Sequence, residues 1–223
     1  MAVPLVVLGA SGHARVIIDA ARRSSAFELL GVVDPNIPAG QRLNGLRSLG
    51  GEECLPEIAA RVDGLAAIIA IGDNAVRARV EGKVLGLVPR IRFAAVIHPA
   101  SVIAEDVTIA DGSFIAAGVT INCGARVGRH AVINTNASVD HDTSIGDFAF
   151  VGPNAALAGG VSVGRMTLIG IGASVIQGIR IGDRAIIGAG AAVVDDIGGD
   201  CLAVGVPARV VKSRADLPTA RGR

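Results

Sequence analysis

The most regular feature of this chain is a six-residue pattern of aliphatic and small residues that starts at Ser101 and ends at Asp196. In sixteen successive hexads the third residue is always Ile, Val or Leu, and the first is always Ser, Thr, Ala, Val or Ile. The residue after the aliphatic is mostly Gly, Ala, Asn or Asp. An antiparallel sheet protein would show alternation broken by turns of varied length, not a fixed period of six. The pattern therefore predicts a repeat architecture.

The period of six fits a triangular solenoid. Each hexad would form one short strand with its aliphatic side chain inside, and the small or turn-prone residues would form the corners. Three hexads make one coil of 18 residues, and coils stack at the sheet spacing of roughly 4.8 Å. Sixteen hexads thus give just over five coils. A narrow interior also accounts for the composition, which has five Phe, no Trp and no Tyr but 30 Gly.

The first part of the chain has a different pattern, in which apolar runs alternate with helical stretches. The segments LVVLGASGHARVIIDAARRS and LAAIIAIGDNAVRARVEGKV each predict a strand, a turn and a helix, and LLGVVDP predicts another strand. Such alternation indicates a small parallel sheet, which binds ligands at the carboxyl ends of its strands. Three loops fall at those ends: Gly9–His13, Asp34 and Gly72–Arg77.

These patterns predict a small Rossmann-like α/β domain followed by a parallel β-helix. The predicted ranges are 1–96 for the α/β domain, 97–212 for the β-helix and 213–223 for a charged tail. The balance of 21 Lys and Arg against 20 Asp and Glu gives no electrostatic reason to expect nucleic acid or an anionic membrane as a partner. No apolar stretch approaches 18 residues, and the start of the chain has no basic region typical of a signal peptide. Three widely spaced cysteines indicate reduced thiols in a cytoplasmic protein.

His141 and Asp142 are the strongest candidates for chemistry in the repeat. His141 is the second residue after an aliphatic position, which is a corner of the predicted solenoid. The 18-residue coil places Cys123 one coil before it and Gly159 one coil after it. An imidazole with space beside it and an orienting carboxylate is the usual arrangement of a general base near neutral pH. The alternative is a pair of solvated turn residues.

Two other features have competing interpretations. The GASGH turn (Gly9–His13) lacks the third glycine of a dinucleotide fingerprint, so a redox cofactor is disfavoured and a phosphate at a helix N-terminus is favoured. A plain strand–helix turn would look the same. His130 lies in the same coil as His141 but at another corner, so it cannot meet His141 within one subunit, although it could do so across a trimer interface. We interpret His130 as structural or as part of the rim of a site.

The motifs GASGH, VVDP, AIGDN, NTNASVDHD, GGVSVG and GVPARVVK together resemble the sugar acyltransferases of the sialic acid O-acetyltransferase type. The chain looks most similar to the N-acetyltransferases of nucleotide-linked 4-amino-4,6-dideoxysugars, and the resemblance covers nearly its whole length. It implies a left-handed β-helix, a homotrimer with active sites between subunits, acetyl-CoA as co-substrate and no metal. It also implies a nucleotide sugar, either GDP-perosamine or a UDP-linked bacillosamine precursor, and on overall resemblance we favour GDP-perosamine.

The resemblance also assigns roles to individual residues. His141 would be the general base with Asp142 as its partner, Gly159 would donate its N–H to the thioester oxygen, and Asn134 would be a nearby polar contact. The substrate-binding residues would be Ser11, Gly12, His13, Asp34, Gly72, Asn74 and Asn134. The residues near coenzyme A would be Gly159, Gly205, Pro207 and Lys212. Some relatives have a second histidine where this chain has Phe150, so any contact of that histidine is absent or replaced here.

Several alternatives remain at this point. Direct transfer with His141 as base is favoured, but acetylation of Cys123 first, as in a ping-pong mechanism, would also fit the stacking. O-acetylation of a sialic-acid-like sugar would use the same His–Asp pair. A zinc carbonic anhydrase on the same solenoid would need three histidine ligands per metal, whereas only His130 and His141 lie in the repeat. A non-catalytic binding scaffold is the remaining possibility.

Overall fold

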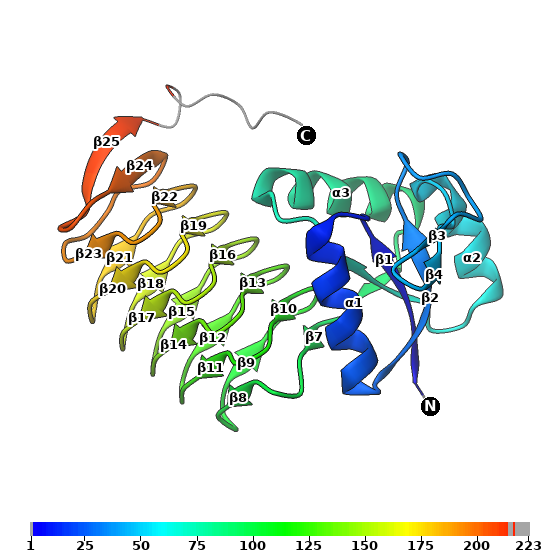
Figure 1. Cartoon of the computed structure of the whole chain (residues 1–223), viewed down its shortest axis with the longest axis horizontal. Coiled ribbons are helices and arrows are strands. Elements are labelled where there is room, and N and C mark those ends of the chain that lie inside the picture. The colour runs from blue at the N-terminus through cyan, green and yellow to red at the C-terminus, as the bar shows by residue number, and fades with distance from the viewer. Residues whose placement is uncertain (1, 214–215, 217–223) are drawn as a thin grey trace.

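The computed structural model describes residues 2–213 and 216, and it consists of an α/β domain packed against one end of a β-solenoid (Figure 1). The α/β domain contains a four-stranded parallel sheet in the order β2-β1-β5-β6. Its elements are β1 (Val3–Leu8), α1 (Gly12–Ser24), β2 (Phe27–Val33), β3 (Arg42–Leu43), β4 (Leu46–Arg47), η1 (Glu52–Cys54), α2 (Leu55–Arg61), β5 (Ala66–Ile69), α3 (Asn74–Leu87) and β6 (Arg92–Phe93).

The strands and helices predicted for the N-terminal part are confirmed. Helix α1 forms because Ala14, Ile17 and Ala21 repeat at helical spacing and are all buried. Helix α3 begins where the Asp73 side chain accepts a hydrogen bond from the Val76 N–H at 2.8 Å. The hydrophobic pattern does not predict α2, the β3–β4 hairpin or β6, because these elements are short and lack a clear period.

The two faces of the sheet have different neighbours. Leu5 and Val7 belong to a hydrophobic core that continues through α1 into the solenoid, whereas Val6 and Leu8 pack in a second core with residues of α2 and α3. Helix α1 therefore lies between the sheet and the first coils of the solenoid, as Figure 1 shows. Because successive side chains of β1 point to opposite faces of the sheet, one face contributes to the core shared with the solenoid and the other to the core of the α/β domain.

The solenoid is built from two-residue strands that form three parallel sheets. Each strand pairs with the strand 18 residues further on, for example Ile115 with Ile133. The strands are β7 (Val96–Ile97), β8 (Val102–Ile103), β9 (Thr108–Ile109), β10 (Phe114–Ile115), β11 (Thr120–Ile121), β12 (Arg126–Val127), β13 (Val132–Ile133), β14 (Ser138–Val139), β15 (Ser144–Ile145), β16 (Phe150–Val151), β17 (Ala156–Leu157), β18 (Ser162–Val163), β19 (Leu168–Ile169), β20 (Ser174–Val175), β21 (Arg180–Ile181), β22 (Ile186–Ile187) and β23 (Ala192–Val193).

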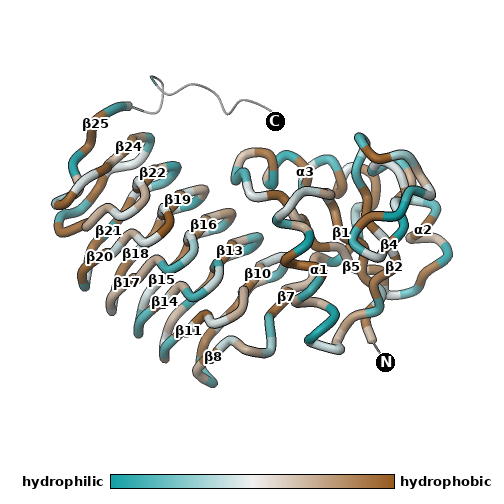
Figure 2. Tube along the Cα trace, in the orientation of Figure 1, coloured by the Kyte–Doolittle hydropathy of each residue, from teal (hydrophilic) through white to brown (hydrophobic). Residues whose placement is uncertain are grey.

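The predicted hexad is confirmed in its details. The aliphatic third residue of each hexad is the second residue of a strand and points into the core, and Figure 2 shows hydrophobic and hydrophilic segments alternating along the coils. The sixth residue of every hexad from Gly112 to Gly190 has a positive φ, whether or not it is glycine. This left-handed position closes each corner and explains the preference there for Gly, Asn and Asp.

Both ends of the solenoid depart from the sixteen predicted hexads. Strand β7 pairs with β10, so the solenoid begins one strand earlier, at Val96. At the other end the last coil is shorter, because Ile187 pairs with Ala203 instead of a residue 18 positions on. The chain then forms an antiparallel hairpin of β24 (Cys201–Val204) and β25 (Arg209–Ser213).

The C-terminal tail and the helices are the subject of two further predictions. Of the predicted tail over 213–223, Ser213 closes β25 and Asp216 is exposed, and the rest lies outside the described residues. Among the helices of residues 2–213, none is long and apolar enough to cross a membrane.

Candidate active site

His141 lies at the corner that follows β14, and the structure stacks it between the predicted neighbours. The Asp142 N–H donates to the Cys123 carbonyl at 3.0 Å, and the Gly160 N–H donates to the His141 carbonyl at 2.8 Å. Asp142 occupies the left-handed corner position, with φ of 58°. The stacking that the 18-residue coil predicted is therefore confirmed. We use the name His141 corner for residues 140–142 together with the equivalent residues of the coils before and after them.

The imidazole of His141 is oriented by contacts at both ends. Its Nδ1 is 2.9 Å from Oδ2 of Asp142, and its side chain is 57% exposed. The opposite ring edge lies over Gly159, where an added Cβ would be only 2.4 Å from Nε2. Only glycine therefore leaves room for the ring in this position. Nε2 has no hydrogen-bond partner among residues 2–213, so it is open to a ligand.

Neighbouring carboxylates change the electrostatics of this ring. The hydrogen bond that the ring donates to Asp142 and the charge of Asp140 raise the pKa of His141 above its ordinary value. Asp140 is held in its ionised form, because hydrogen bonds from Asn122 Nδ2 at 2.8 Å and from the His141 N–H at 2.8 Å lower its pKa. An imidazole with one nitrogen tied to a carboxylate and the other free can accept a proton from a substrate.

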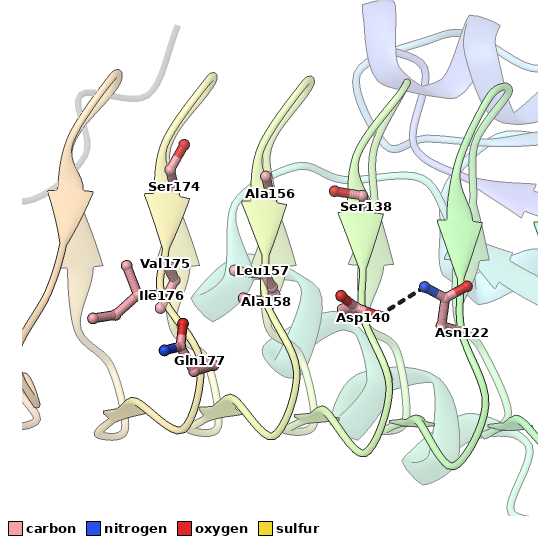
Figure 3. A pocket seen from close by; sticks show the side chains of 10 residues that line it. All are labelled: Asn122, Ser138, Asp140, Ala156, Leu157, Ala158, Ser174, Val175, Ile176 and Gln177. Carbon is pink, nitrogen blue, oxygen red and sulfur yellow. Dashed lines mark hydrogen bonds between the residues drawn. The ribbon is translucent and has the colours of Figure 1, made fainter.

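A groove of about 400 Å³ runs along the solenoid beside this corner. It lies over β11, β14, β17 and β20, and Figure 3 shows its lining side chains distributed across these neighbouring strands. Asn122 and Asp140 line one end, and Ile176 and Gln177 line the other. Since Asp140 and Ala158 line it and directly precede His141 and Gly159, the groove leads to the imidazole. A long, narrow ligand could lie in it with one end at His141.

A second cavity of about 190 Å³ lies at the carboxyl ends of β1 and β2, where the sheet pattern predicted ligand binding. Its lining residues are Leu8, Gly9, Val33, Asp34, Pro35, Asn36, Glu52, Ile71, Val76 and Val80. Asp34 Oδ1 accepts hydrogen bonds from the Asn36 backbone N–H at 2.9 Å and from its side-chain amide at 3.1 Å.

Glu52 is the unexpected member of this second cavity. Its side chain is 9% exposed and lies 2.8 Å from Lys83 Nζ. Burial alone would raise the pKa of this carboxyl, but the ion pair with Lys83 and a bond from its own backbone N–H give a net lowering. No pattern in the sequence points to this residue, because it follows a Gly-Gly turn inside a region without a regular period.

The predicted substrate-binding residues do not all line the cavity. Asp34 does, together with Gly9 of the GASGH turn. Ser11 and Gly12 are exposed at the start of α1, and Gly72 is half-buried in the loop after β5. The ring of His13 instead packs against Phe114 and Phe150 of the solenoid, with centroids 5.7 and 6.2 Å away. Burial and the charge of Arg77 lower the pKa of His13 to about 4.

Two other predicted residues also face away from the cavity. Asn74 Nδ2 donates to the carbonyls of Met166 and Thr167, so this side chain points toward the solenoid. Asn134 lies at the corner after β13, one side of the triangle away from His141, and its Oδ1 accepts from the Thr135 N–H. The roles assigned to these residues stay predictions.

The predicted cofactor-binding residues near the C-terminus lie at the far end of the solenoid. Gly205 and Pro207 lie in the turn between β24 and β25, and Lys212 lies on β25 opposite Leu202. Phe150, where the resemblance implied a second histidine in some relatives, is turned toward His13. Within residues 2–213 and 216, no group of three or more His, Cys, Asp or Glu side chains is arranged to hold a metal ion.

His130 is buried at the next corner and is structural, as interpreted. Its ring stacks on Phe148 at 5.0 Å with an interplanar angle of 8°, and Phe93 packs edge-on against it. Nε2 lies 3.1 Å from Oε1 of Glu81, which also pairs with Arg129 at 3.1 Å. Burial and the neighbouring guanidinium groups lower the pKa of His130 to about 4, so the ring is neutral and donates to Glu81. We call residues 128–130, 146–148 and 164–166 the His130 corner.

An α/β domain joined to a hexapeptide solenoid, with an oriented histidine at a corner, is the arrangement of a class of acyltransferases, and comparison with known proteins supports this. The PglD N-terminal domain family matches residues 4–84. The structure of perosamine N-acetyltransferase from Caulobacter crescentus, solved as a variant in complex with CoA and GDP-perosamine, is 36% identical with a TM-score of 0.87. The match covers 94% of this chain and 97% of that one.

Two other solved structures are similar over their whole length. The acetyltransferase domain of PglB from Neisseria gonorrhoeae, in complex with acetyl coenzyme A, is 27% identical with a TM-score of 0.87, and the match covers 95% of this chain and 100% of that one. WeeI from Acinetobacter baumannii is 27% identical with a TM-score of 0.84, covering 94% and 100%. The chain belongs to the hexapeptide-repeat family of sugar N-acetyltransferases, and it is an acetyltransferase.

Proposed function

We propose that this enzyme transfers an acetyl group from acetyl-CoA to the 4-amino group of a nucleotide-linked 4-amino-4,6-dideoxysugar, with GDP-perosamine as the preferred acceptor. The observation that carries the proposal is the His141 imidazole, tied to Asp142 through Nδ1 and open at Nε2 above Gly159. Support comes from the Caulobacter perosamine N-acetyltransferase, which was solved with CoA and GDP-perosamine in variants that replace one histidine by Asn or Ala.

The geometry supports direct transfer. Nε2 of His141 takes a proton from the sugar amine as the amine nitrogen attacks the thioester carbonyl. The new C–N bond forms, the C–S bond breaks, and coenzyme A leaves as the thiolate, which takes up a proton. The Gly159 N–H makes no hydrogen bond among the described residues, so it is free to donate to the developing oxyanion. One such donor contributes roughly 10²–10³ in rate.

The groove beside the His141 corner suits the extended shape of acetyl-CoA. It leads from His141 along the solenoid toward the C-terminal coils, so the thioester would lie at the imidazole and the remainder of the cofactor further along. Gly205, Pro207 and Lys212 would then contact the part of coenzyme A that is remote from the reaction. A dependence on acetyl-CoA and three free cysteines both fit a cytoplasmic enzyme.

The nucleotide would occupy the cavity of the α/β domain, and Glu52 favours a guanine base there. Guanine presents two adjacent donors, its ring N–H and its exocyclic amine, to which a carboxylate can bind with both oxygens. Uracil offers a single N–H on its pairing edge. An ionised, nearly buried carboxylate on the cavity wall therefore supports GDP over UDP.

The positions of the two cavities also support a homotrimer with active sites between subunits. In one chain the α/β domain contacts the His130 corner and the strands on which α1 rests, whereas the groove and His141 belong to another side and corner of the solenoid. None of the polar contacts of His141 comes from residues 2–93. A neighbouring subunit would have to bring the acceptor and the imidazole together.

Steady-state assays with acetyl-CoA and a panel of nucleotide-linked amino sugars test this function. We expect turnover with GDP-perosamine, weaker turnover with a UDP-linked 4-amino sugar, and none with CMP-linked sialic acid. A calorimetric screen of GDP, UDP, CMP and dTDP should show GDP binding most tightly, and Glu52→Gln should reduce that preference. Transfer to a sialic acid hydroxyl would instead support O-acetylation, and absence of any transfer would leave a binding scaffold.

A further inference from the structure

Arg77 is the largest fully buried side chain among the described residues, and it takes no part in the proposed acetyl transfer at His141. It lies on α3 and all of its N–H groups have partners. Nε donates to the His130 carbonyl at 2.8 Å, Nη2 donates to the Phe148 carbonyl at 2.7 Å, and Nη1 donates to the carbonyls of Ile71 at 2.9 Å and Gly72 at 3.1 Å. A single guanidinium therefore joins two coils of the solenoid to the loop after β5.

The acceptors on the solenoid follow its repeat. His130, Phe148 and Met166 are equivalent residues of three successive coils, and all three have positive φ values. Arg77 binds the first two carbonyls, and Asn74 Nδ2 binds that of Met166 at 2.9 Å. The Asn74 side-chain oxygen also accepts from Arg77 Nη2 at 2.8 Å. The start of α3 is thus fixed to three consecutive turns of one corner.

The same helix forms a wall of the nucleotide cavity. Val76 and Val80 line the cavity, whereas Asn74, Arg77 and Glu81 face the His130 corner. Ile71, whose carbonyl Arg77 binds, also lines the cavity. A displacement of α3 along the solenoid would therefore move the cavity wall by the same amount.

The chemistry of these contacts requires arginine. No carboxylate among residues 2–213 and 216 bonds to the Arg77 guanidinium, and its partners are backbone carbonyl oxygens and the side-chain oxygen of Asn74. A planar group with five N–H donors can bind several such oxygens at once, whereas a lysine ammonium has three donors at one point. Burial lowers the pKa of Arg77 to about 10, so it stays charged at neutral pH.

We propose that Arg77 is a positioning residue for acetyl transfer, which fixes the nucleotide cavity at the distance from the solenoid that places the sugar amine at a catalytic His141. This inference rests on the proposed function, because it requires the acceptor to be held by its nucleotide in the cavity of the α/β domain. It predicts that the excess of kcat/KM for the nucleotide-linked amino sugar over the free amino sugar depends on Arg77. A displacement of about 1 Å at the reacting atoms costs on the order of 10²-fold in rate.

The experiment compares two acceptors in two variants. Arg77→Lys should reduce kcat/KM for the nucleotide-linked amino sugar by about 10- to 100-fold. The slow rate with the free amino sugar, which does not use the cavity, should stay within about twofold of the wild type. Arg79→Lys is the matched control, because Arg79 is exposed on the same helix, and it should behave as wild type with both acceptors. A parallel loss with both acceptors, or no loss with either, would overturn the proposal.

Two further measurements separate positioning from folding and from the proposed function. Calorimetry should give the same nucleotide Kd for wild type and Arg77→Lys, since the cavity itself is retained. If Arg77→Lys does not fold, Asn74→Ala removes the third corner bond, the bond to the Thr167 carbonyl and one acceptor of Arg77, and it should show a smaller loss confined to the nucleotide-linked acceptor. A loss with both acceptors in Asn74→Ala would also overturn the proposal. A wild-type enzyme without any transfer would instead contradict the proposed function.

Discussion

His130 and His141 lie eleven positions apart, at two corners of one coil, and the fold gives them opposite properties. His130 is 1% exposed, stacked on Phe148, and neutral because its pKa is lowered to about 4. The His141 side chain is 57% exposed and carries a carboxylate partner that raises its pKa. Residue type therefore does not determine function in a solenoid. The role of each histidine is set by its position within the hexad and by whether the α/β domain covers its corner.

The difference begins with the register. His130 is the sixth residue of its hexad and has the left-handed backbone, with φ of 53°, whereas His141 is the fifth residue and leaves that position to Asp142. Holding a bulky residue in this conformation costs on the order of 1 kcal/mol, which the contacts with α3 and Phe93 offset at the His130 corner. At the His141 corner Asp142 adopts the turn at lower cost, and its side chain remains free to orient the imidazole.

The largest expected effect is on the exposed histidine. His141→Asn should lower kcat by roughly 10²–10⁴, because the amine then loses its proton acceptor. Oligomeric state and acetyl-CoA binding should be unchanged, since the ring makes no core contact. Steady-state kinetics, calorimetry and light scattering measure the three quantities. Near-normal turnover in the folded variant would contradict the role of His141 as base.

The next effect concerns the space beneath the imidazole. Gly159→Ala would place a methyl group 2.4 Å from the ring, so His141 must move, and a shift of about 1 Å should cost roughly 10²-fold in kcat/KM. Gly198→Ala is the control, because Gly198 also lies in the solenoid but has nothing within 4 Å of an added Cβ. Equal activity of the two variants would show that the ring position seen here is not the catalytic one.

The sequence predicted the His141 corner better than the α/β domain for a physical reason. Successive coils are related by a fixed spacing, so the neighbours of His141 follow from counting 18 residues in either direction. Packing between the two parts of the molecule follows no period. The hydrogen bonds of Arg77 span 53 and 71 positions, and the contacts of Asn74 and His13 depend on how a helix rests on the solenoid. Nothing in the local pattern shows which way these side chains turn.

The buried histidine should affect stability instead of activity. Lowering its pKa from 6.5 to about 4 means that the unfolded chain binds a proton that the folded His130 does not, so unfolding free energy falls as pH falls from 6.5 to 4. Over this pH range the lowered pKa of His130 changes the unfolding free energy by about 3 kcal/mol. His130→Gln should lower Tm at neutral pH through lost packing, but its Tm should depend less on pH in this window. The pKa of His13 is also lowered to about 4, so the variant should retain the pH dependence of stability that His13 contributes. An unchanged pH dependence in His130→Gln would contradict this assignment.

The carboxylate partner of His141 should shift the pH dependence of catalysis. The base must be neutral, so kcat/KM rises with pH through the pKa of His141, and Asp142 holds that pKa above its ordinary value. Asp142→Asn removes the charge and leaves at most a weaker hydrogen bond to a neutral amide oxygen, so the rising limb should move to lower pH while the maximal rate falls. Asp147→Asn, at the His130 corner, is a control that should leave the limb in place. If Asp142→Asn did not move the rising limb of the kcat/KM–pH profile, a group other than His141 would be responsible for that limb.

The smallest effect is expected for the thiol that stacks directly before His141. Cys123 lies one coil from the imidazole, and its carbonyl accepts the Asp142 N–H. The ring edge that carries Nε2, however, lies over Gly159, on the opposite side from Cys123. The free nitrogen is therefore placed to deprotonate an acceptor next to Gly159, not the thiol. Cys123→Ala should retain full kcat and show no burst of acetylated enzyme in rapid-quench experiments. A loss comparable to that of His141→Asn, with acetyl-enzyme trapped in the wild type, would instead establish a ping-pong route through Cys123.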